Sequence, residues 1–324
     1  MKKNLNIVYM GTPEFAVAPL KLLLENGFNI SAVITAPDKP CGRGLKVAHS
    51  PVYLFAKEKG LKILQPVKLK DENFINELSE INPDLQIVVA FRMLPEAIWK
   101  LPKIGTFNLH ASLLPQYRGA APINRAIMNG ETKTGVTTFF INENIDTGNI
   151  LLQQETPINP DETAGELHDK LMNIGSDLVL KTVQMIENGN IKTIPQNKFV
   201  TENIVLNNAP KIFSNDCKIN WNAGIDSVFN HIRGLSPYPA AHTELISPEG
   251  TPYYIKVFRC TKRKETHNYK TGKILTDRRT QINVAVPGGF INLVEIQLHS
   301  KKKMTIPQFL CGFPIDDNWS VNLI

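Results

Sequence analysis

The chain has 324 residues, 42% of them hydrophobic, and a formal net charge of +6 at pH 7. This length is sufficient for two domains with sizeable cores. No stretch approaches the roughly 20 apolar residues of a membrane span, and the short apolar run near Met1 is typical of a first strand rather than of a signal peptide. We therefore expect a cytoplasmic protein with no membrane partner.

The net charge bears on the kind of partner, and the cysteines bear on metal binding and on the redox compartment. A basic surface favours a polyanion such as RNA, although a merely solvated surface would have the same balance. The four cysteines lie far apart and form no CxxC or other metal-binding pattern. We expect free thiols in a reducing compartment.

The first 35 residues predict a βαβ opening. The apolar run at residues 5–10 predicts a strand, residues 16–27 predict a helix, and residues 29–35 predict a second strand. No GxGxxG motif follows the first strand, so a nicotinamide-dinucleotide site has little support.

Residues 36–51, APDKPCGRGLKVAHSP, interrupt this order. The two prolines and two glycines at their centre argue against regular structure, and three basic residues supply charge: Lys39, Arg43 and Lys46. A loop this long inside a compact domain is usually functional or mobile. A simple unstructured connection is the alternative.

Helices and strands then alternate as far as residue 189. Helices are predicted at 52–60, 72–82 and 161–189, and strands at 62–65, 84–90, 134–142 and 149–158. The strand at 84–90 is almost wholly apolar, as a central parallel strand should be. The alternation predicts an α/β domain with a doubly wound, mostly parallel sheet.

Residues 105–125, GTFNLHASLLPQYRGAAPINR, carry polar residues in a suggestive pattern. The alternation at their start predicts a strand with Asn108 and His110 on one face. A turn at 144–148, NIDTG, presents Asp146. Ligands of open α/β sheets bind beyond the carboxyl ends of the strands, so we expect these three side chains to converge there.

An amide, an imidazole and a carboxylate suit the attack of an amine on a carbonyl group. The amide can donate to a developing oxyanion, and the imidazole can move the proton of the amine. A neighbouring carboxylate fixes the imidazole tautomer and favours its cation. With no nucleophilic Cys or Ser in the trio, direct transfer is favoured over a covalent intermediate. Each residue taken alone also has an ordinary role, as a strand cap, a core histidine or a turn aspartate.

The wider string favours the catalytic roles. NLHASLLPQYRGAAPINRA, at 108–126, resembles the signature of the folate-dependent formyltransferases, an Asn-x-His followed by SLLPxxRGAxP. NIDTG resembles their aspartate-bearing loop. The resemblance implies that Asn108, His110 and Asp146 are the catalytic trio. It also implies that 10-formyltetrahydrofolate is the co-substrate and that no metal is required.

The resemblance assigns roles to two more regions. PDKPCGRGLK, at 37–46, resembles the basic loop with which family members that act on tRNA enter its acceptor stem, and Arg43 matches the central arginine of that loop. This implies RNA contacts for Lys39, Arg43 and Lys46. The folate is expected at the loop after the strand at 84–90 and at the signature, on these residues: Phe91, Arg92, Ser112, Leu113, Leu114 and Pro115. The family usually has a Tyr-Gly pair where this chain has Phe91 and Arg92.

The pattern changes after residue 189. Residues 190–207 lack a clear period, so we expect a linker between a catalytic domain at 1–189 and a second domain at 208–324. A helix ending near Gly234 and short strands are predicted there, the strands at 252–260, 270–277, 281–286 and 289–298. This region resembles a small barrel of the oligonucleotide-binding type.

Three basic clusters lie in the second domain: KRK at 262–264, RR at 278–279 and KKK at 301–303. Basic residues at the strand ends of a barrel would follow a phosphate backbone, although they also fit a solubilising surface. The basic loop at 36–51 points to the same partner, so we favour RNA.

Together the resemblances imply transfer of a formyl group to the α-amine of methionine on initiator tRNA, for translation initiation. We expect a monomer. One alternative is a member of the same family that acts on a small amine, such as an amino-sugar nucleotide or glycinamide ribonucleotide, and the basic regions argue against it. The other is a non-catalytic RNA-binding protein, against which the intact trio argues.

Overall fold

The computed structural model describes residues 5–41, 46–200 and 205–323. These divide into two compact units. The first unit comprises residues 1–119, 134–156 and 168–208, and the second unit comprises residues 120–133, 157–167 and 209–324. The predicted domain limits at 189 and 208 stay a prediction, because the units are groups of mutually packed segments rather than continuous stretches of chain.

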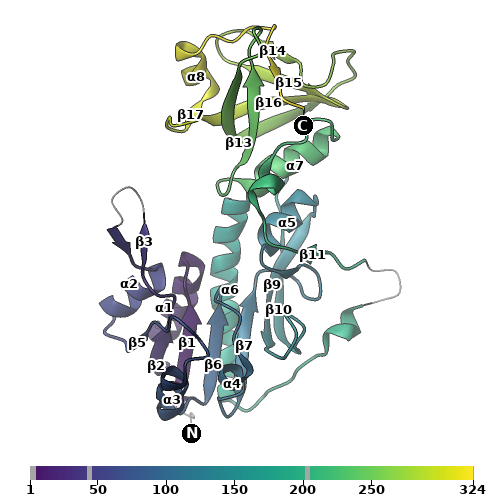
Figure 1. Cartoon of the computed structure of the whole chain (residues 1–324). Helices are drawn as coiled ribbons and strands as arrows, with labels where there is room; N and C mark the ends of the chain where they lie inside the picture. Colours follow the sequence, from purple (N-terminus) through teal and green to yellow (C-terminus); the bar gives the residue numbers. More distant parts are fainter. Residues whose placement is uncertain (1–4, 42–45, 201–204, 324) are drawn as a thin grey trace. The chain divides into compact units, whose positions relative to one another are not determined.

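A seven-stranded sheet, with the order β10-β9-β7-β6-β1-β2-β5, organises the first unit (Figure 1). Its strands are β1 (Ile7–Gly11), β2 (Ile30–Ile34), β5 (Ile63–Leu64), β6 (Leu85–Val89), β7 (Gly105–His110), β9 (Lys133–Phe140) and β10 (Ile150–Pro157). The strands from β5 to β7 are parallel, and β9 runs antiparallel to β7. This confirms the predicted doubly wound, mostly parallel sheet.

The strand order reverses between β1 and β6. The chain leaves β1 toward β2 and β5, then returns to place β6 and β7 on the other side of β1. Such a reversal is where doubly wound sheets bind their ligands, beyond the carboxyl ends of the strands. Strand β6 is buried along its whole length, as predicted for a central strand.

Helices connect these strands or follow the last of them. They are η1 (Glu14–Ala16), α1 (Val17–Glu25), α2 (Pro51–Glu58), α3 (Glu72–Ile81), α4 (Glu96–Trp99), the long α6 (Ala164–Glu187) and η2 (Gln196–Phe199). The side chains of Ser50 and Asp71 cap α2 and α3 by accepting hydrogen bonds from backbone amides of the first turn. The strand and helix periods of the sequence therefore located most of the first unit.

One prediction in the first unit was wrong. Residues 36–51 were expected to lack regular structure, but β3 (Lys39–Cys41) and β4 (Lys46–Ala48) pair as a short antiparallel ladder. Pro40 lies within it, opposite Val47. A two-stranded ladder exposes an outer edge on each strand, so a proline without an N–H group is tolerated there.

The second unit is a nearly closed antiparallel barrel with accompanying helices. Its strands are β12 (Ala241–Ile246), β13 (Pro252–Lys264), β14 (Ile274–Thr276), β15 (Ile282–Val286), β16 (Gly289–Leu298), β17 (Met304–Thr305) and β18 (Ser320–Val321). They follow the order β14-β15-β16-β13-β12-β18, and a bridge between Lys273 and Ser320 joins the two ends. The helices are α5 (Pro122–Met128), α7 (Ile225–Leu235) and α8 (Ile306–Gly312).

The predicted barrel is confirmed, but several of its elements were missed. Strand β12 has no counterpart among the predicted strands, although its residues alternate between buried and half-buried. Its start follows directly on the proline-rich turn after α7. Two two-residue strands and one short helix complete the described elements: β8 (Arg118–Gly119), β11 (Asn208–Ala209) and η3 (Ser214–Cys217).

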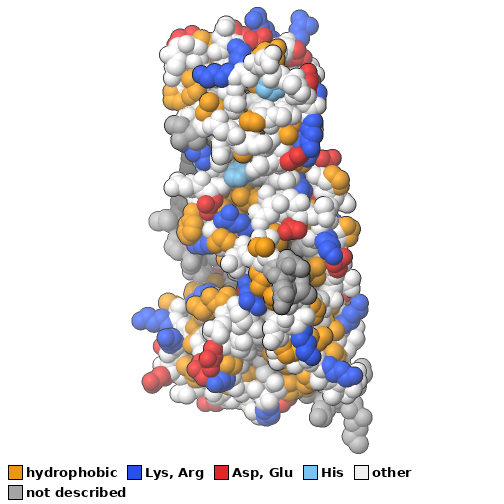
Figure 2. Space-filling model, turned by 90° about the vertical axis from the view of Figure 1, so that its right-hand side faces the viewer, with side chains coloured by type: hydrophobic (Ala, Val, Ile, Leu, Met, Phe, Trp, Pro, Cys, Tyr) orange, Lys and Arg blue, Asp and Glu red, His pale blue; other side chains and the backbone are white. Residues whose placement is uncertain are grey.

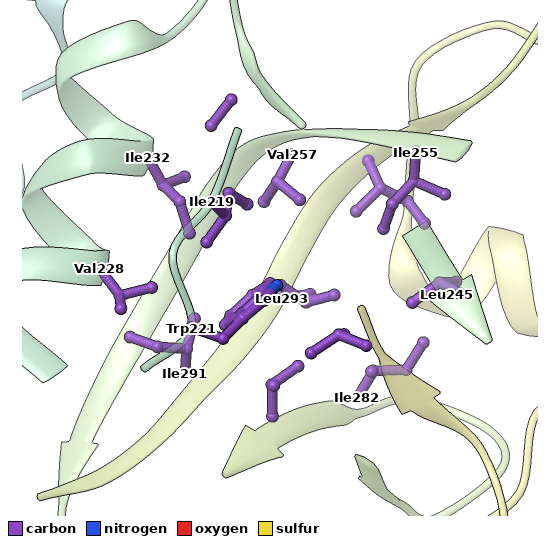
Figure 3. Close-up of a cluster of buried hydrophobic side chains, with 14 of the residues drawn as sticks. Ile219, Trp221, Val228, Ile232, Leu245, Ile255, Val257, Ile282, Ile291 and Leu293 are labelled. Carbon is purple, nitrogen blue, oxygen red and sulfur yellow. The ribbon is translucent and has the colours of Figure 1, made fainter. Parts of the chain in front are cut away.

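The core of the barrel is built around Trp221, which is fully buried (Figure 3). Branched aliphatic side chains from α7 and from the barrel strands surround the indole, among them Val228, Ile291 and Leu293. The indole N–H donates to the hydroxyl of Thr243, at 2.9 Å, so its polar atom is satisfied in the apolar interior. Within the described residues, no helix is both long and apolar enough to cross a membrane.

Candidate active site

Strand β7 carries Asn108 on the face of the sheet that packs against the loop after β6. Met10, Val88 and Asn108 are register partners on three neighbouring strands, so their side chains point to the same side. Leu94 and Ile98 pack on that side against the same cluster as Met10 and Val88. Asn108 is half-buried, and no hydrogen bond to another described residue occupies its amide. The amide is therefore free to donate to a ligand.

His110, two residues farther along the strand, is buried, with 6% of its surface exposed. Its Nε2 lies 2.8 Å from the carbonyl oxygen of Tyr117. A carbonyl oxygen only accepts, so Nε2 carries a hydrogen and donates it. The other ring nitrogen, Nδ1, lies 3.8 Å from Oδ2 of Asp146. Nδ1 is thus the ring atom left to exchange a proton with a substrate.

The carboxylate of Asp146 is held by the chain that follows His110. Its Oδ2 accepts a hydrogen bond from the backbone amide of Gly119 at 2.9 Å, and its side chain is only 15% exposed. The distance of 3.8 Å to His110 Nδ1 is too long for a direct hydrogen bond. With Nε2 protonated, the neutral imidazole turns a lone pair toward this carboxylate, so the contact is attractive only when His110 is a cation.

The loop that carries Asp146 has an unusual backbone. Asp146 adopts a positive φ of 53°, which is uncommon for a residue with a side chain. Two residues later, a Cβ atom on Gly148 would lie 1.6 Å from the carbonyl oxygen of Phe140, so only glycine fits there. The NIDTG sequence therefore serves a specific turn that aims the carboxylate toward His110.

The signature residues assigned to the folate are mostly engaged inside the protein. Ser112 is fully buried and donates from its hydroxyl to the carbonyl of Gln116 at 2.6 Å. Leu114 donates from its backbone amide to Thr137 Oγ1 at 3.1 Å, and Pro115 next to it is buried. Leu113 is half-buried. Their folate contacts stay a prediction, whereas their role in fixing the turn beyond His110 is visible in these bonds.

Arg92 does not extend freely into solvent. Its guanidinium donates to the backbone carbonyls of Pro66 and Val67, at 2.8 and 3.2 Å, and lies over the ring of Phe91 at 5.2 Å. Burial lowers the pKa of Arg92 from its usual value. Phe91 packs against the same apolar cluster as Leu94. The Phe91–Arg92 pair thus ties the loop after β6 to the loop after β5, and its role toward the folate stays a prediction.

The predicted RNA contacts of the first unit cannot be placed. Arg43 lies outside the described residues, as do the side chains of Lys39 and Lys46. Only the backbone of the last two is described, in β3 and β4.

The basic clusters of the second unit are partly neutralised by acids. Lys262 and Lys264 both pair with Asp226, at 2.6 and 2.7 Å, and Arg263 pairs with Glu265 at 2.8 Å. On the face drawn in Figure 2, lysines and arginines are interspersed with acidic side chains rather than gathered in one field. An RNA surface on the barrel would therefore depend on which of these ion pairs open.

One buried residue at the site was missed by sequence reasoning. Gln196, in the stretch predicted to be a linker, is 4% exposed and hydrogen-bonds to Asp146, Gly148 and Arg118. A glutamine in an aperiodic polar stretch carries no periodic signal of burial. The only available hint was that Pro195 precedes it, a sign of a fixed turn rather than of a free chain.

Comparison with known proteins places this site in a family. The family model described as formyl transferase matches residues 3–183, and the model of the formyl transferase C-terminal domain matches residues 211–314. The chain therefore belongs to the formyl transferase family. The two matches fall on the two parts of the fold, the sheet that carries the trio and the barrel.

Similar curated proteins extend over the whole chain. The methionyl-tRNA formyltransferase of Bacteroides thetaiotaomicron is 51% identical over 321 residues, which cover 99% of both chains. That of Phocaeicola vulgatus is 54% identical over 318 residues, which cover 98% of both. Among solved structures, the N-formyltransferase of Helicobacter canadensis in complex with folinic acid and dTDP-3-aminofucose covers 93% of this chain and 100% of its own. Its TM-score of 0.65 at 23% identity shows a shared fold.

Proposed function

We propose that this protein transfers the formyl group of 10-formyltetrahydrofolate to the α-amine of methionyl initiator tRNA, for translation initiation. The observation that carries the proposal is the site itself, where His110 Nδ1 faces Asp146 Oδ2 beside the unoccupied amide of Asn108. Relatives about half identical over nearly the full chain bear the name of this activity. A monomer acting in the cytoplasm belongs to the same proposal.

Asn108 and His110 stabilise the charge that develops during transfer. The amine attacks the formyl carbon, and the carbonyl oxygen becomes an oxyanion. The amide of Asn108, with no hydrogen bond to another described residue, donates to this oxygen. Protonated His110 donates from Nδ1, because its Nε2 hydrogen is already committed to the carbonyl of Tyr117. Two donors placed before the reaction need no reorganisation when the charge appears.

Asp146 acts on His110 rather than on the formyl group. Its carboxylate lies 3.8 Å from Nδ1 and attracts the imidazole when the ring is protonated, which is the state that donates to the oxyanion. The attacking amine loses a proton as the C–N bond forms, and the folate nitrogen gains one as it departs. The cationic imidazole can give its Nδ1 proton to the departing folate nitrogen, and the neutral imidazole that results can then take the proton that the amine loses, directly or through a water molecule.

Incubation of the protein with 10-formyltetrahydrofolate and charged initiator tRNA tests the proposal. We expect formyl-methionine on the tRNA, and with it a tRNA KM that rises steeply with salt through counterion release. Arg43→Ala should raise the KM for tRNA and leave the KM for the folate nearly unchanged. Formylation of a small amine in place of the tRNA, with no salt dependence, would favour the alternative substrate, and tRNA binding without transfer would exclude the enzyme.

A further inference from the structure

The connecting segment at 190–207 is built into the first unit at residue 196. Gln196 opens the short helix η2, and its side chain is buried with 4% exposed. Just before it, Ile194 forms two backbone hydrogen bonds with Ile150, both of 2.9 Å. Ile150 begins β10, directly after the turn that carries Asp146. Residues 194–196 are therefore fixed against the base of that turn.

Both ends of the Gln196 carboxamide are fully used. Its Oε1 accepts from Nε and Nη2 of Arg118, at 3.0 and 2.6 Å. Its Nε2 donates to the backbone carbonyls of Asp146 and Gly148, at 2.8 and 2.9 Å. A carboxamide offers two acceptor sites and two donor hydrogens, so all of them have partners here. A glutamate would lack the donors, and a lysine would lack the acceptors.

Gln196 joins Arg118 to the turn of Asp146, and these two places lie next to the oxygens that face the ring nitrogens of His110. Arg118 follows Tyr117, whose carbonyl accepts from His110 Nε2. Asp146 presents its carboxylate to His110 Nδ1 from a backbone with positive φ. An uncommon backbone conformation persists when neighbouring contacts enforce it, and the carbonyl of Asp146 is one of the two that Gln196 holds.

We propose that Gln196 is a positioning residue of the reaction, which sets the carboxylate of Asp146 against the imidazole of His110. The inference rests on the proposed function but concerns a residue outside the trio. Gln196 bonds to the backbone of Asp146 rather than to its carboxylate, so it acts through the turn. Gln196 thus supports the position of a catalytic residue from outside the sheet.

The proposal predicts a loss of kcat rather than of binding. Displacing a catalytic group by a fraction of an ångström to an ångström costs up to about 100-fold in rate. Gln196→Leu should therefore lower kcat about 10–100-fold and change the KM of the folate and of the tRNA less than about threefold. Gln184→Leu, an exposed glutamine of α6, is the matched control and should behave as the native protein.

A second variant covers the case in which Gln196→Leu fails to fold. Gln196→Glu keeps acceptors for Arg118, replaces the donors to the carbonyls of Asp146 and Gly148 by an oxygen, and adds a negative charge. Its kcat should fall by the same order. In the Asp146→Asn background, Gln196→Glu should cost less than about threefold more, because the group that it positions is already lost. Full multiplication of the two losses would overturn the proposal.

A readout without substrate separates this inference from the proposed function. Nitrogen-15 NMR of the imidazole should show a changed Nδ1 signal of His110 in both Gln196→Leu and Gln196→Glu, and the native signal in Gln184→Leu. If the native protein formylates tRNA and Gln196→Glu matches it in kcat and in the His110 spectrum, the positioning role is wrong and the function stands. If the spectrum changes but the native protein transfers no formyl group, the function is wrong and the positioning stands.

Discussion

The loops of the first unit and the interior of the barrel bury different kinds of side chain. Near the end of β7 the buried groups are polar, namely His110, Ser112, Thr137 and Gln196, and each has a partner. The barrel core consists of apolar side chains around Trp221. Burial of a polar group costs free energy of folding unless the group is hydrogen-bonded. A cluster of buried polar groups therefore indicates a place where side-chain positions are fixed by hydrogen bonds. The polar burial at the end of β7 fits the proposed active site, and the apolar core of the barrel fits a role in stability.

The largest expected effect is a loss of turnover caused by a substitution at the end of β7, with the fold unchanged. His110→Ala should lower kcat about 10²–10⁴-fold, because it removes a donor to the oxyanion and a proton carrier. Steady-state formylation measures this, with circular dichroism to confirm the fold. His168→Ala, a partly exposed histidine on α6 beside Asp169, is the control. Near-native turnover of a pure His110→Ala protein would exclude the catalytic role.

Next in size is a change that acts on stability alone. Trp221→Ala should cost about 3–5 kcal/mol through the cavity that it leaves in the barrel. It also leaves the buried hydroxyl of Thr243 without its partner. The loss in the free energy of unfolding is measured by urea titration, with amide hydrogen exchange of β12 and β13 as the probe. Tyr238→Ala, which removes an aromatic side chain that is 83% exposed in the same unit, should have almost no effect. Equal losses for the two would mean that Trp221 is not the centre of the core.

The smallest effect concerns a charge at the surface of the second unit. The backbone amide of Thr163 donates to Oε2 of Glu166 at 2.8 Å, and the backbone amide of Glu166 donates to Oγ1 of Thr163 at 3.3 Å, which forms a capping box at the start of α6. The bond from the Thr163 amide, with help from Arg259, lowers the pKa of Glu166 from its usual value. Its contribution is therefore present above the unfolded value of about 4.3 and is lost as the pH falls through that value and below.

Glu166→Gln should lower stability slightly at neutral pH and match the native protein in strong acid. Denaturant unfolding at several pH values measures this difference. Glu80→Gln, which changes an exposed residue of α3, should show none. A difference between Glu166→Gln and the native protein that persists unchanged into strong acid would point to shape rather than charge.

Periodicity in the sequence was sufficient to predict the regular elements around the site. The apolar run of β6 and the alternation around Asn108 and His110 placed these residues at the end of a parallel sheet. The barrel strands β15 and β16 were predicted as short strands separated by glycine, aspartate and lysine residues. These elements are determined by contacts that repeat along the chain, and such contacts leave a pattern in it.

The features that the sequence did not predict depend on contacts between distant residues. Gln196 meets Asp146 across 50 positions, and nothing around it in the sequence indicates that it is buried. The ladder of β3 and β4 was missed because prolines and glycines outweigh strand propensity in a local interpretation. The KRK cluster at 262–264 was interpreted as a basic surface from its own residues. In the structure Lys262 and Lys264 form ion pairs with Asp226, which lies 36 or more positions earlier in the sequence.

The bridge between Lys273 and Ser320 affects how the protein behaves at high concentration. A sheet with two open ends offers unpaired amides and carbonyls to any passing strand, and chains can add to one another in this way. Here β18 pairs with β12, and Ser320 of β18 also forms a bridge with Lys273, the residue before β14. Backbone amides and carbonyls at the two ends of the sheet therefore bond to each other within one molecule. We therefore expect that removal of β18 would expose the edges of β12 and β14 and promote aggregation.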